Sequence, residues 1–352
     1  MIRALSIIAL FGGASVVAPM QASAASFDCS KASTPFEHAI CDHDALSAAD
    51  LRLALTYDTA VGGLSEKARN EVRTGQREWL SYAQRACTRD ARPLTSGAYD
   101  ERGLECLVEV FTSRSKVLEQ SRMVSGLRFY PLARYEALQD PYEAEDPDSY
   151  WPVARHELSW VELDSDEGFA HAFNDTIRER ALASAPVAAG DVGDGEEDGD
   201  SATSDTNNSL FLKEVAGPNR ITLEASTYWY GHGAAHGNWG VFYRHYLIKQ
   251  GRFMEASDIF EGDDWLAALK DLTLDAARAE HGDNLMLDDI SFLDTIVADP
   301  SRWDLSDPYA LVIQFLPYEI SAYAYGAPQV RVKWDDLDAY LSDDANPMRY
   351  GY

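Results

Sequence analysis

The chain has 352 residues, of which 58 are acidic and 30 are basic, so its formal net charge is -28. A chain with this charge should repel nucleic acid and anionic lipid, and its field should favour encounters with cationic partners. After the first 25 residues, no apolar run approaches the roughly 20 residues that span a bilayer. These features exclude a nucleic-acid-binding protein and a multi-span membrane protein.

Residues 1–25 have the pattern of a secretory signal peptide. Arg3 is followed by an apolar run over residues 4–17 and then by small residues that suit an A-x-A type cleavage site. Gly12 and Pro19 interrupt the apolar segment, which argues against a membrane anchor. Removing residues 1–25 deletes one cation and moves the net charge from -28 to -29. We therefore expect a periplasmic or secreted protein that has no membrane attachment after cleavage.

The four cysteines are Cys29, Cys41, Cys87 and Cys106. Export places them in an oxidising compartment, so we expect two disulfides. Four cysteines allow three pairings. Proximity in the sequence favours Cys29 with Cys41 and Cys87 with Cys106, because each pairing closes a short loop. The chain has no C-x-x-C pair, which disfavours a zinc site.

The region around the cysteines carries apolar residues at helical spacing, and we predict three helices there. Ser47 and Asp50 resemble a capping box at the start of the first helix. The residues that mark the three helices are Leu51, Ala54, Leu55 and Asp58; Val72, Trp79, Ala83 and Cys87; and Leu104, Val108, Phe111 and Leu118. Such a small bundle buries little by itself, so disulfides would compensate for its small core.

The same region follows the pattern F-D-C-x-x-A, I-C, L-x-x-x-D, L-x-x-x-Y, Q-R-x-W-L, C and C-L. The matching residues are Phe27, Asp28, Cys29, Ala32, Ile40, Cys41, Leu46, Asp50, Leu53, Tyr57, Gln76, Arg77, Trp79, Leu80, Cys87, Cys106 and Leu107. Over residues 27–120 this pattern resembles the N-terminal domain of LprI-type lysozyme inhibitors. The resemblance implies that the protein binds and blocks lysozyme.

Residues 226–260 join two strand signals through a glycine-rich connection. Aromatic residues end the first strand, and residues 241–248 suit a second half-buried strand. The glycines between them allow tight turns and close backbone approach, so the polar and aromatic residues there should be held on a shaped loop. Binding sites often lie on such loops. The candidate partner-binding residues are Tyr230, His232, His236, Asn238 and Trp239.

Two sequence blocks resemble a secreted domain of unknown function that the anti-sigma factor RsiV and the peptidoglycan deacetylase PdaC share. The first follows S-x-Y-x-G-G-A-H-G-N and then D-x-F, with Ala234 in place of the second family glycine. Its residues are Ser226, Tyr228, Gly233, Ala235, His236, Gly237, Asn238, Gly251, Asp258, Ile259 and Phe260. The second follows Y-E-[IV]-x-x-Y-A-x-G through Pro317, Tyr318, Glu319, Ile320, Ala322, Tyr323, Ala324 and Gly326. In RsiV this domain recognises lysozyme, so the resemblance implies the same partner.

The remaining segments complete an α+β fold. We predict a linker at residues 122–126, a helix through Phe173 and Ile177, and a flexible acidic loop at residues 186–209. The loop lacks the register of a calcium site, which leaves calcium as a weaker alternative. Helical periodicity over 265–280 and alternation at 311–315 and 330–334 predict a further helix and two strands.

This organisation predicts two domains after the signal peptide. Residues 26–122 should form a small, disulfide-bonded, all-α domain, and residues 127–345 an antiparallel sheet with packed helices on one face.

The sequence contains no catalytic motif that we identify. His232 and His236 stand four apart, as zinc ligands do in some sites, but the H-E-x-x-H arrangement is absent. There is no G-x-S-x-G elbow, and the T-F-D-D-G type motif of the PdaC catalytic domain is missing. We therefore expect a non-enzymatic protein with no cofactor and no metal.

The function that these observations favour is binding, and either inhibiting or sensing, a lysozyme or a related basic muramidase in the cell envelope. Two alternatives stay open, a peptidoglycan or carbohydrate binding module and a metal-dependent envelope enzyme.

Overall fold

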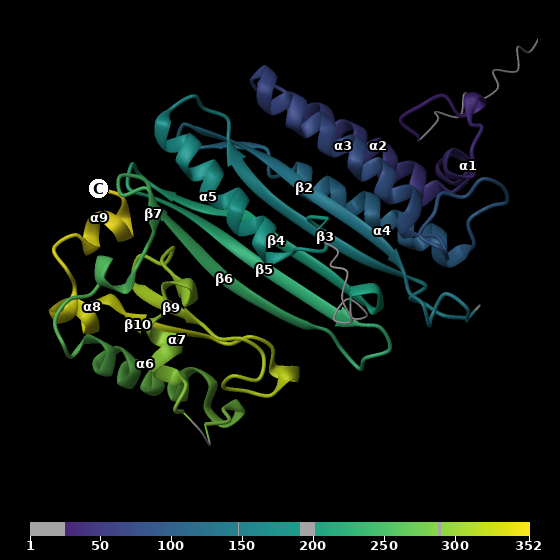
Figure 1. Cartoon of the computed structure of the whole chain (residues 1–352). Coiled ribbons are helices and arrows are strands. Elements are labelled where there is room, and N and C mark those ends of the chain that lie inside the picture. Colours follow the sequence, from purple (N-terminus) through teal and green to yellow (C-terminus); the bar gives the residue numbers. More distant parts are fainter. Residues whose placement is uncertain (1–24, 147, 191–200, 288–289) are drawn as a thin grey trace, which may run out of the picture.

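The computed structural model describes residues 25–146, 148–190, 201–287 and 290–352 (Figure 1). A seven-stranded sheet organises the molecule, with its strands side by side in the order in which they follow in the chain. These strands are β1 (Arg122–Val124), β2 (Leu127–Gln139), β3 (Val153–Leu163), β4 (Ser204–Ala216), β5 (Arg220–Gly231), β6 (Asn238–Leu247) and β7 (Arg252–Phe253). A second sheet has the order β10-β9-β8, with β8 (Trp303–Asp304), β9 (Ala310–Gln314) and β10 (Gln329–Lys333).

The helices fall into an N-terminal group, a central helix and a C-terminal group. They are α1 (Pro35–Asp42), α2 (Asp44–Val61), α3 (Glu66–Ala86), α4 (Glu101–Leu118), α5 (Gly168–Ser184), α6 (Trp265–His281), α7 (Leu293–Ala298), α8 (Trp334–Leu337) and α9 (Ala345–Tyr350). This confirms the α+β class, with a helical, disulfide-bonded N-terminal region and a mainly antiparallel sheet. The pair β3 and β4 is parallel. The connection between them contains α5, because parallel neighbours need a long crossover.

Both disulfides that sequence proximity favours are present. Cys29 is bonded to Cys41, and Cys87 is bonded to Cys106. The predicted helix start at Ser47 is wrong. The capping box belongs instead to α1, where Thr34 and Glu37 exchange side-chain to backbone hydrogen bonds. Helix α2 begins at Asp44, so Ser47 lies inside it and donates to the Ile40 carbonyl.

The buried face of α2 also differs from the predicted one. Leu51 and Leu55 are 39% and 61% exposed, whereas Leu46 and Leu53 are buried. Leucines occur on both sides of this helix, so its periodicity did not decide which side packs against α1 and α4.

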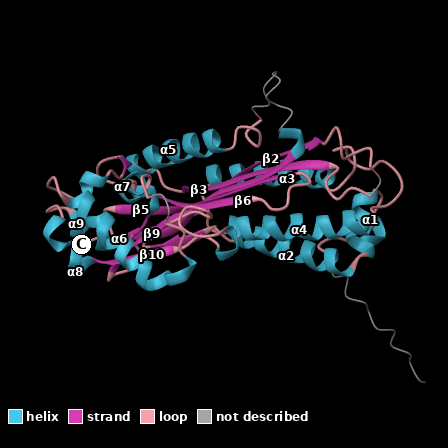
Figure 2. Cartoon of the chain, turned by 90° about the horizontal axis from the view of Figure 1, so that it is seen from below, coloured by secondary structure: helices cyan, strands magenta, loops and turns pink. Residues whose placement is uncertain are grey.

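The large sheet is covered on both faces, which corrects the expectation of helices on one face. Figure 2 shows α5 above the strands and α2 and α4 below them. On the first face, the Asn174 side chain of α5 bonds the backbone N–H and C=O of Leu163. On the other face, Ser113 of α4 donates to Glu157 of β3. Because β3 is buried on both sides, it lacks the alternation that reveals a strand.

One continuous hydrophobic core joins the N-terminal helices to the sheet. It includes Trp79 and Phe111 from the helices, Phe129 and Trp160 from the first strands, and Phe173 from α5. A second core lies in the C-terminal part, around Trp303, Phe260 and Ile313. The helical region therefore does not rely on a small core of its own.

Packed elements also contact the outer strands of the large sheet. Helix α3 packs along β2, where Tyr82 stacks on Tyr135 with ring centroids 5.0 Å apart. At the other side, β7 pairs with the end of β6. His245 of β6 lies with Nε2 2.8 Å from the carbonyl oxygen of Trp303 in the C-terminal sheet.

Two segments that the sequence predicts to be irregular contain strands instead. Residues 122–126, expected as a linker, form β1 and a turn in which Ser125 and Gly126 have positive φ. The prediction of a flexible acidic loop at 186–209 is wrong from Ser204 onward, because β4 begins there and pairs with strands on both sides. Residues 191–200, which include most of the calcium alternative, lie outside the described residues. Within the described chain, no helix is both long enough and apolar enough to span a membrane.

Candidate functional site

The candidate loop connects two long neighbouring strands. β5 and β6 pair in register from Arg220 opposite Leu247 to Trp229 opposite Asn238. Tyr228 lies opposite Trp239, so both side chains project from the same face of the sheet. They stay 41% and 36% exposed. Two large rings therefore lie next to each other on an accessible surface.

The loop that follows β9 meets this hairpin. The His236 ring stacks on the Tyr323 ring with centroids 3.9 Å apart. The Tyr323 hydroxyl donates to the Gly237 carbonyl at 2.6 Å, and the Tyr318 hydroxyl lies 3.2 Å from His236 Nε2. The two sequence blocks that resemble the RsiV and PdaC domain are thus in contact in space.

We call these five rings the aromatic cluster: Tyr228, His236, Trp239, Tyr318 and Tyr323. Tyr318 has φ of 72° and is 60% exposed. This left-handed conformation is costly for a bulky residue, and strained residues of this kind concentrate at functional sites. At Gly237, an added Cβ would lie 2.8 Å from the Tyr228 ring and from the Trp229 carbonyl oxygen. A glycine is therefore required for the close packing of the cluster.

His232 has different surroundings from His236. Its side chain is 2% exposed, with Nδ1 2.6 Å from Asp140 and Nε2 3.3 Å from Asp205. Burial alone would lower the pKa of His232, but the hydrogen bonds and charges of the two aspartates outweigh burial and raise it. The result is a buried ion cluster that ties the end of β5 to the end of β2 and the start of β4.

The structure thus places the five residues predicted for partner binding in different surroundings. His236 and Trp239 belong to the aromatic cluster, and Asn238 is exposed beside it. Tyr230 is half-buried, with its ring 5.7 Å from that of Trp151 and its hydroxyl bonded to the Ala234 carbonyl. His232 is held in the ion cluster. Their role in binding stays a prediction.

Tyr228, Tyr318 and Tyr323 were not selected from the sequence as contact residues. All three lie within the two blocks that resemble the secreted domain, so those blocks were the available signal. Within the residues that the structure describes, no group of three or more His, Cys, Asp or Glu side chains is arranged to hold a metal ion.

Comparison with known families confirms the two-part resemblance. Residues 29–118 match the family described as Lysozyme inhibitor LprI. Residues 257–335 match the family described as Protein of unknown function (DUF3298). The second match includes the block around Tyr318 and Tyr323 but begins after the β5–β6 hairpin. No curated protein matches the chain.

Two solved structures of the DUF3298 family resemble this one. A member from Bacteroides fragilis NCTC 9343 has 13% identity and a TM-score of 0.44, and the alignment covers 65% of this chain and 98% of that one. A member from Pseudomonas aeruginosa PAO1 has 17% identity and a TM-score of 0.43, with 62% and 96% covered.

Proposed function

We propose that this is an exported cell-envelope protein that binds and inhibits lysozyme-type muramidases. The observation that carries the proposal is the match of residues 29–118 to a lysozyme-inhibitor family. Two disulfides in that region suit an oxidising compartment, and residues 1–25 have the pattern of a signal peptide. Animal-type lysozymes are strongly basic, and the net charge of -28 would speed their association with this chain.

The aromatic cluster is the proposed contact surface. Exposed aromatic side chains supply much of the binding energy at protein interfaces when a partner surrounds and desolvates them. Trp239 and Tyr318 are the most suitable anchors, because both are large and accessible. Inhibition would follow from steric occlusion of the muramidase cleft, with the acidic charge steering the approach.

Calorimetry of residues 26–352 with c-type, g-type and bacterial lysozymes, together with a cell-lysis assay, tests this function. We expect submicromolar binding that inhibits lysis and weakens as salt is raised. Trp239→Ala and Tyr318→Ala should each weaken binding by about tenfold. Tyr309→Ala is the matched control, because Tyr309 is 79% exposed and lies outside the cluster.

A variant of the helical region tests whether the muramidase contacts α2 or the aromatic cluster. Leu55→Asp places a charge on the exposed side of α2, away from its buried face. If this change abolishes binding while the cluster variants bind normally, the contact lies on α2 and the proposed surface is wrong. If the wild-type protein binds no enzyme of the panel, the muramidase function itself is wrong.

A further inference from the structure

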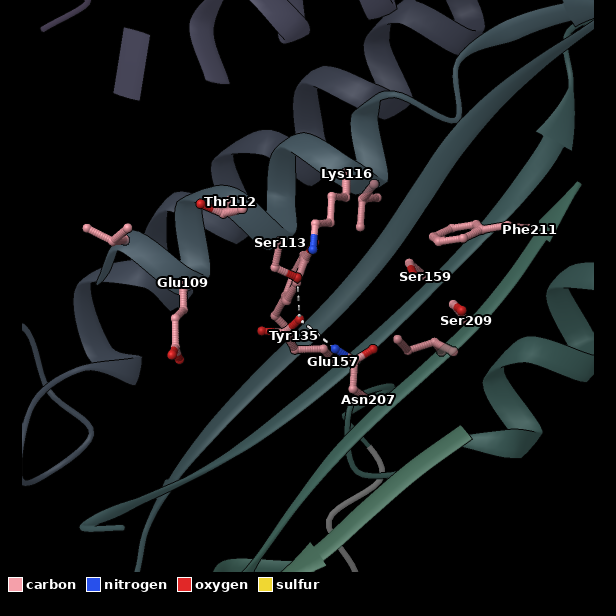
Figure 3. Close-up of a pocket in the computed structure, with 13 residues that line it drawn as sticks. Glu109, Thr112, Ser113, Lys116, Tyr135, Glu157, Ser159, Asn207, Ser209 and Phe211 are labelled. Atoms are coloured by element: carbon pink, nitrogen blue, oxygen red, sulfur yellow. Dashed lines mark hydrogen bonds between the residues drawn. The ribbon is translucent and has the colours of Figure 1, made fainter. Parts of the chain in front are cut away.

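A groove lies between α4 and the face of the sheet that α4 covers (Figure 3). It is a cavity of about 410 Å³, and a second cavity of about 190 Å³ continues it toward Tyr228. Both are lined by Glu109, Ser113, Glu157 and Asn207. The groove therefore runs from the middle of the sheet toward the aromatic cluster.

The floor of the groove comes from neighbouring strands and combines polar side chains with the apolar side chains of Leu158 and Phe211. Ser159 of β3 lies beside Ser209 of β4, which lies opposite Ser226 of β5. In the adjacent row, Asn207 lies opposite Tyr228. Among the described residues, no side chain or backbone group forms a hydrogen bond with the hydroxyl of Ser159 or of Ser209, both of which line the groove. These hydroxyls are therefore available to a ligand.

The carboxylate in the floor already has three hydrogen-bond donors. Glu157 accepts hydrogen bonds from the Tyr82 hydroxyl at 2.9 Å, from Ser113 Oγ at 3.2 Å and from Asn207 Nδ2 at 3.4 Å. Its hydrogen bonds are therefore satisfied within the protein. At the rim, α4 contributes charges of opposite sign, Glu109 and Lys116. In the second cavity, Arg155 and Asp205 form an ion pair at 3.7 Å, and charges paired in this way suit an uncharged ligand.

Other classes of polymer fit this groove poorly. An extended peptide binds by adding a strand to a free sheet edge, whereas this groove lies over a face of the sheet, beside α4 (Figure 3). An amphipathic helix needs an apolar floor, whereas hydroxyl, amide and carboxylate groups here alternate with the apolar side chains of Leu158 and Phe211. A polyanion would be repelled by the net charge of -28.

We propose that the groove binds an uncharged oligosaccharide. Hydroxyl and amide groups of the floor would bond the sugar hydroxyls, while Tyr228 and Trp239 would stack against the apolar faces of the sugar rings at the open end. The occupant lies along the sheet with one side held by α4, so the helical region and the sheet build the site together. This site shares Tyr228 and Trp239 with the muramidase contact proposed above, whereas its floor belongs to the groove alone.

Calorimetry of residues 26–352 with three tetrasaccharides tests the proposal: chitotetraose, cellotetraose and a sulfated heparin fragment. We expect at least one neutral oligosaccharide to bind and the sulfated one not to bind. Ser209→Trp fills the groove and should weaken binding by at least tenfold. Tyr228→Ala removes a stacking ring and should weaken it by about three- to tenfold. Tyr309→Ala should bind as the wild type does.

The outcomes are separable from those of the muramidase experiment. Ser209→Trp should bind muramidase normally, because Ser209 lies in the groove and outside the aromatic cluster. If this variant does not fold, Tyr228→Ala still tests the site, since its ring is on the surface. The proposal is overturned if no neutral oligosaccharide binds, if the sulfated fragment binds more tightly, or if both groove variants bind sugar as the wild type does.

Discussion

The imidazole of His236 stacks on the Tyr323 ring, with centroids 3.9 Å apart and planes inclined by 20°. His236 lies in the connection between β5 and β6, and Tyr323 begins the short helix η6 (Tyr323–Tyr325) after β9. Tyr323 also donates a hydrogen bond to the Gly237 carbonyl, 86 residues away in the chain. The conformation of the loop after β9 is therefore coupled to that of the hairpin.

Tyr323→Phe tests this coupling. The change keeps the stacked ring and removes the 2.6 Å hydrogen bond to Gly237. The free energy of unfolding should fall by about 1 kcal/mol, the typical net value of one hydrogen bond. Urea denaturation measures the loss. Tyr309→Phe is the control, because that ring is 79% exposed. Equal effects of the two changes would mean that the hydrogen bond does not stabilise the loop.

Gly237→Ala should disturb the cluster through steric overlap. The new Cβ would lie 2.8 Å from the Tyr228 ring, so the ring or the backbone must move. We expect the protein to lose about 1–3 kcal/mol of stability, as overpacked sites do. Gly168→Ala is the matched control, because open space surrounds the first residue of α5. Thermal unfolding compares the two, and similar melting temperatures would refute the overlap.

His232→Gln should change how stability depends on pH. The folded pKa of His232 is raised above its unfolded value near 6.5. Its stabilising contribution is therefore complete below that pH and declines as pH rises through the folded pKa. His245 does not share this trend, because burial first and then the charge of Arg220 lower its pKa to about 3.

Melting temperatures between pH 5 and pH 9 measure this dependence. At pH 6 the variant should be less stable by about 3–5 kcal/mol, because a buried ion cluster loses its cation. The difference from wild type should shrink as pH rises. His171→Gln, on the exposed side of α5, should leave the pH profile unchanged. A constant difference across the range would contradict the role given to His232.

Replacing Cys87 and Cys106 together with serine should destabilise the whole molecule. The bond closes a loop with a sequence separation of 19, worth about 3 kcal/mol in the loop-entropy model. Because α4 shares one core with the sheet, the loss should lower a single cooperative transition. Urea unfolding followed by tryptophan fluorescence and by circular dichroism tests this. Separate transitions for helices and sheet would show that the core is not cooperative.

Several features could be predicted from the sequence because their causes are local. The cysteine pairs are close in the chain, and both disulfides form as expected. Helix α6 has an amphipathic period over nearly its full length, and it was predicted at 265–280. The strands β5 and β6 are rich in aromatic and branched residues, which suit a pleated surface. The two family resemblances were carried by motifs that stay recognisable without a structure.

Features that depend on distant partners could not be predicted. β4 begins in the polar residues 204–208, which have no strand pattern and become part of a strand because β3 and β5 bond β4 on both sides. Leu51 and Leu55 look like core residues, yet α1 and α4 pack on the other side of α2.

The surroundings of the candidate site residues also depend on distant partners. By itself, the sequence determined the two families, the disulfides and the glycine-rich loop with its two histidines. Only the tertiary structure gave those histidines different surroundings, because Asp140 and Asp205 converge on His232 while Tyr318 and Tyr323 converge on His236. These partners lie far away in the chain, and local spacing carries no information about contacts that the packed sheet creates.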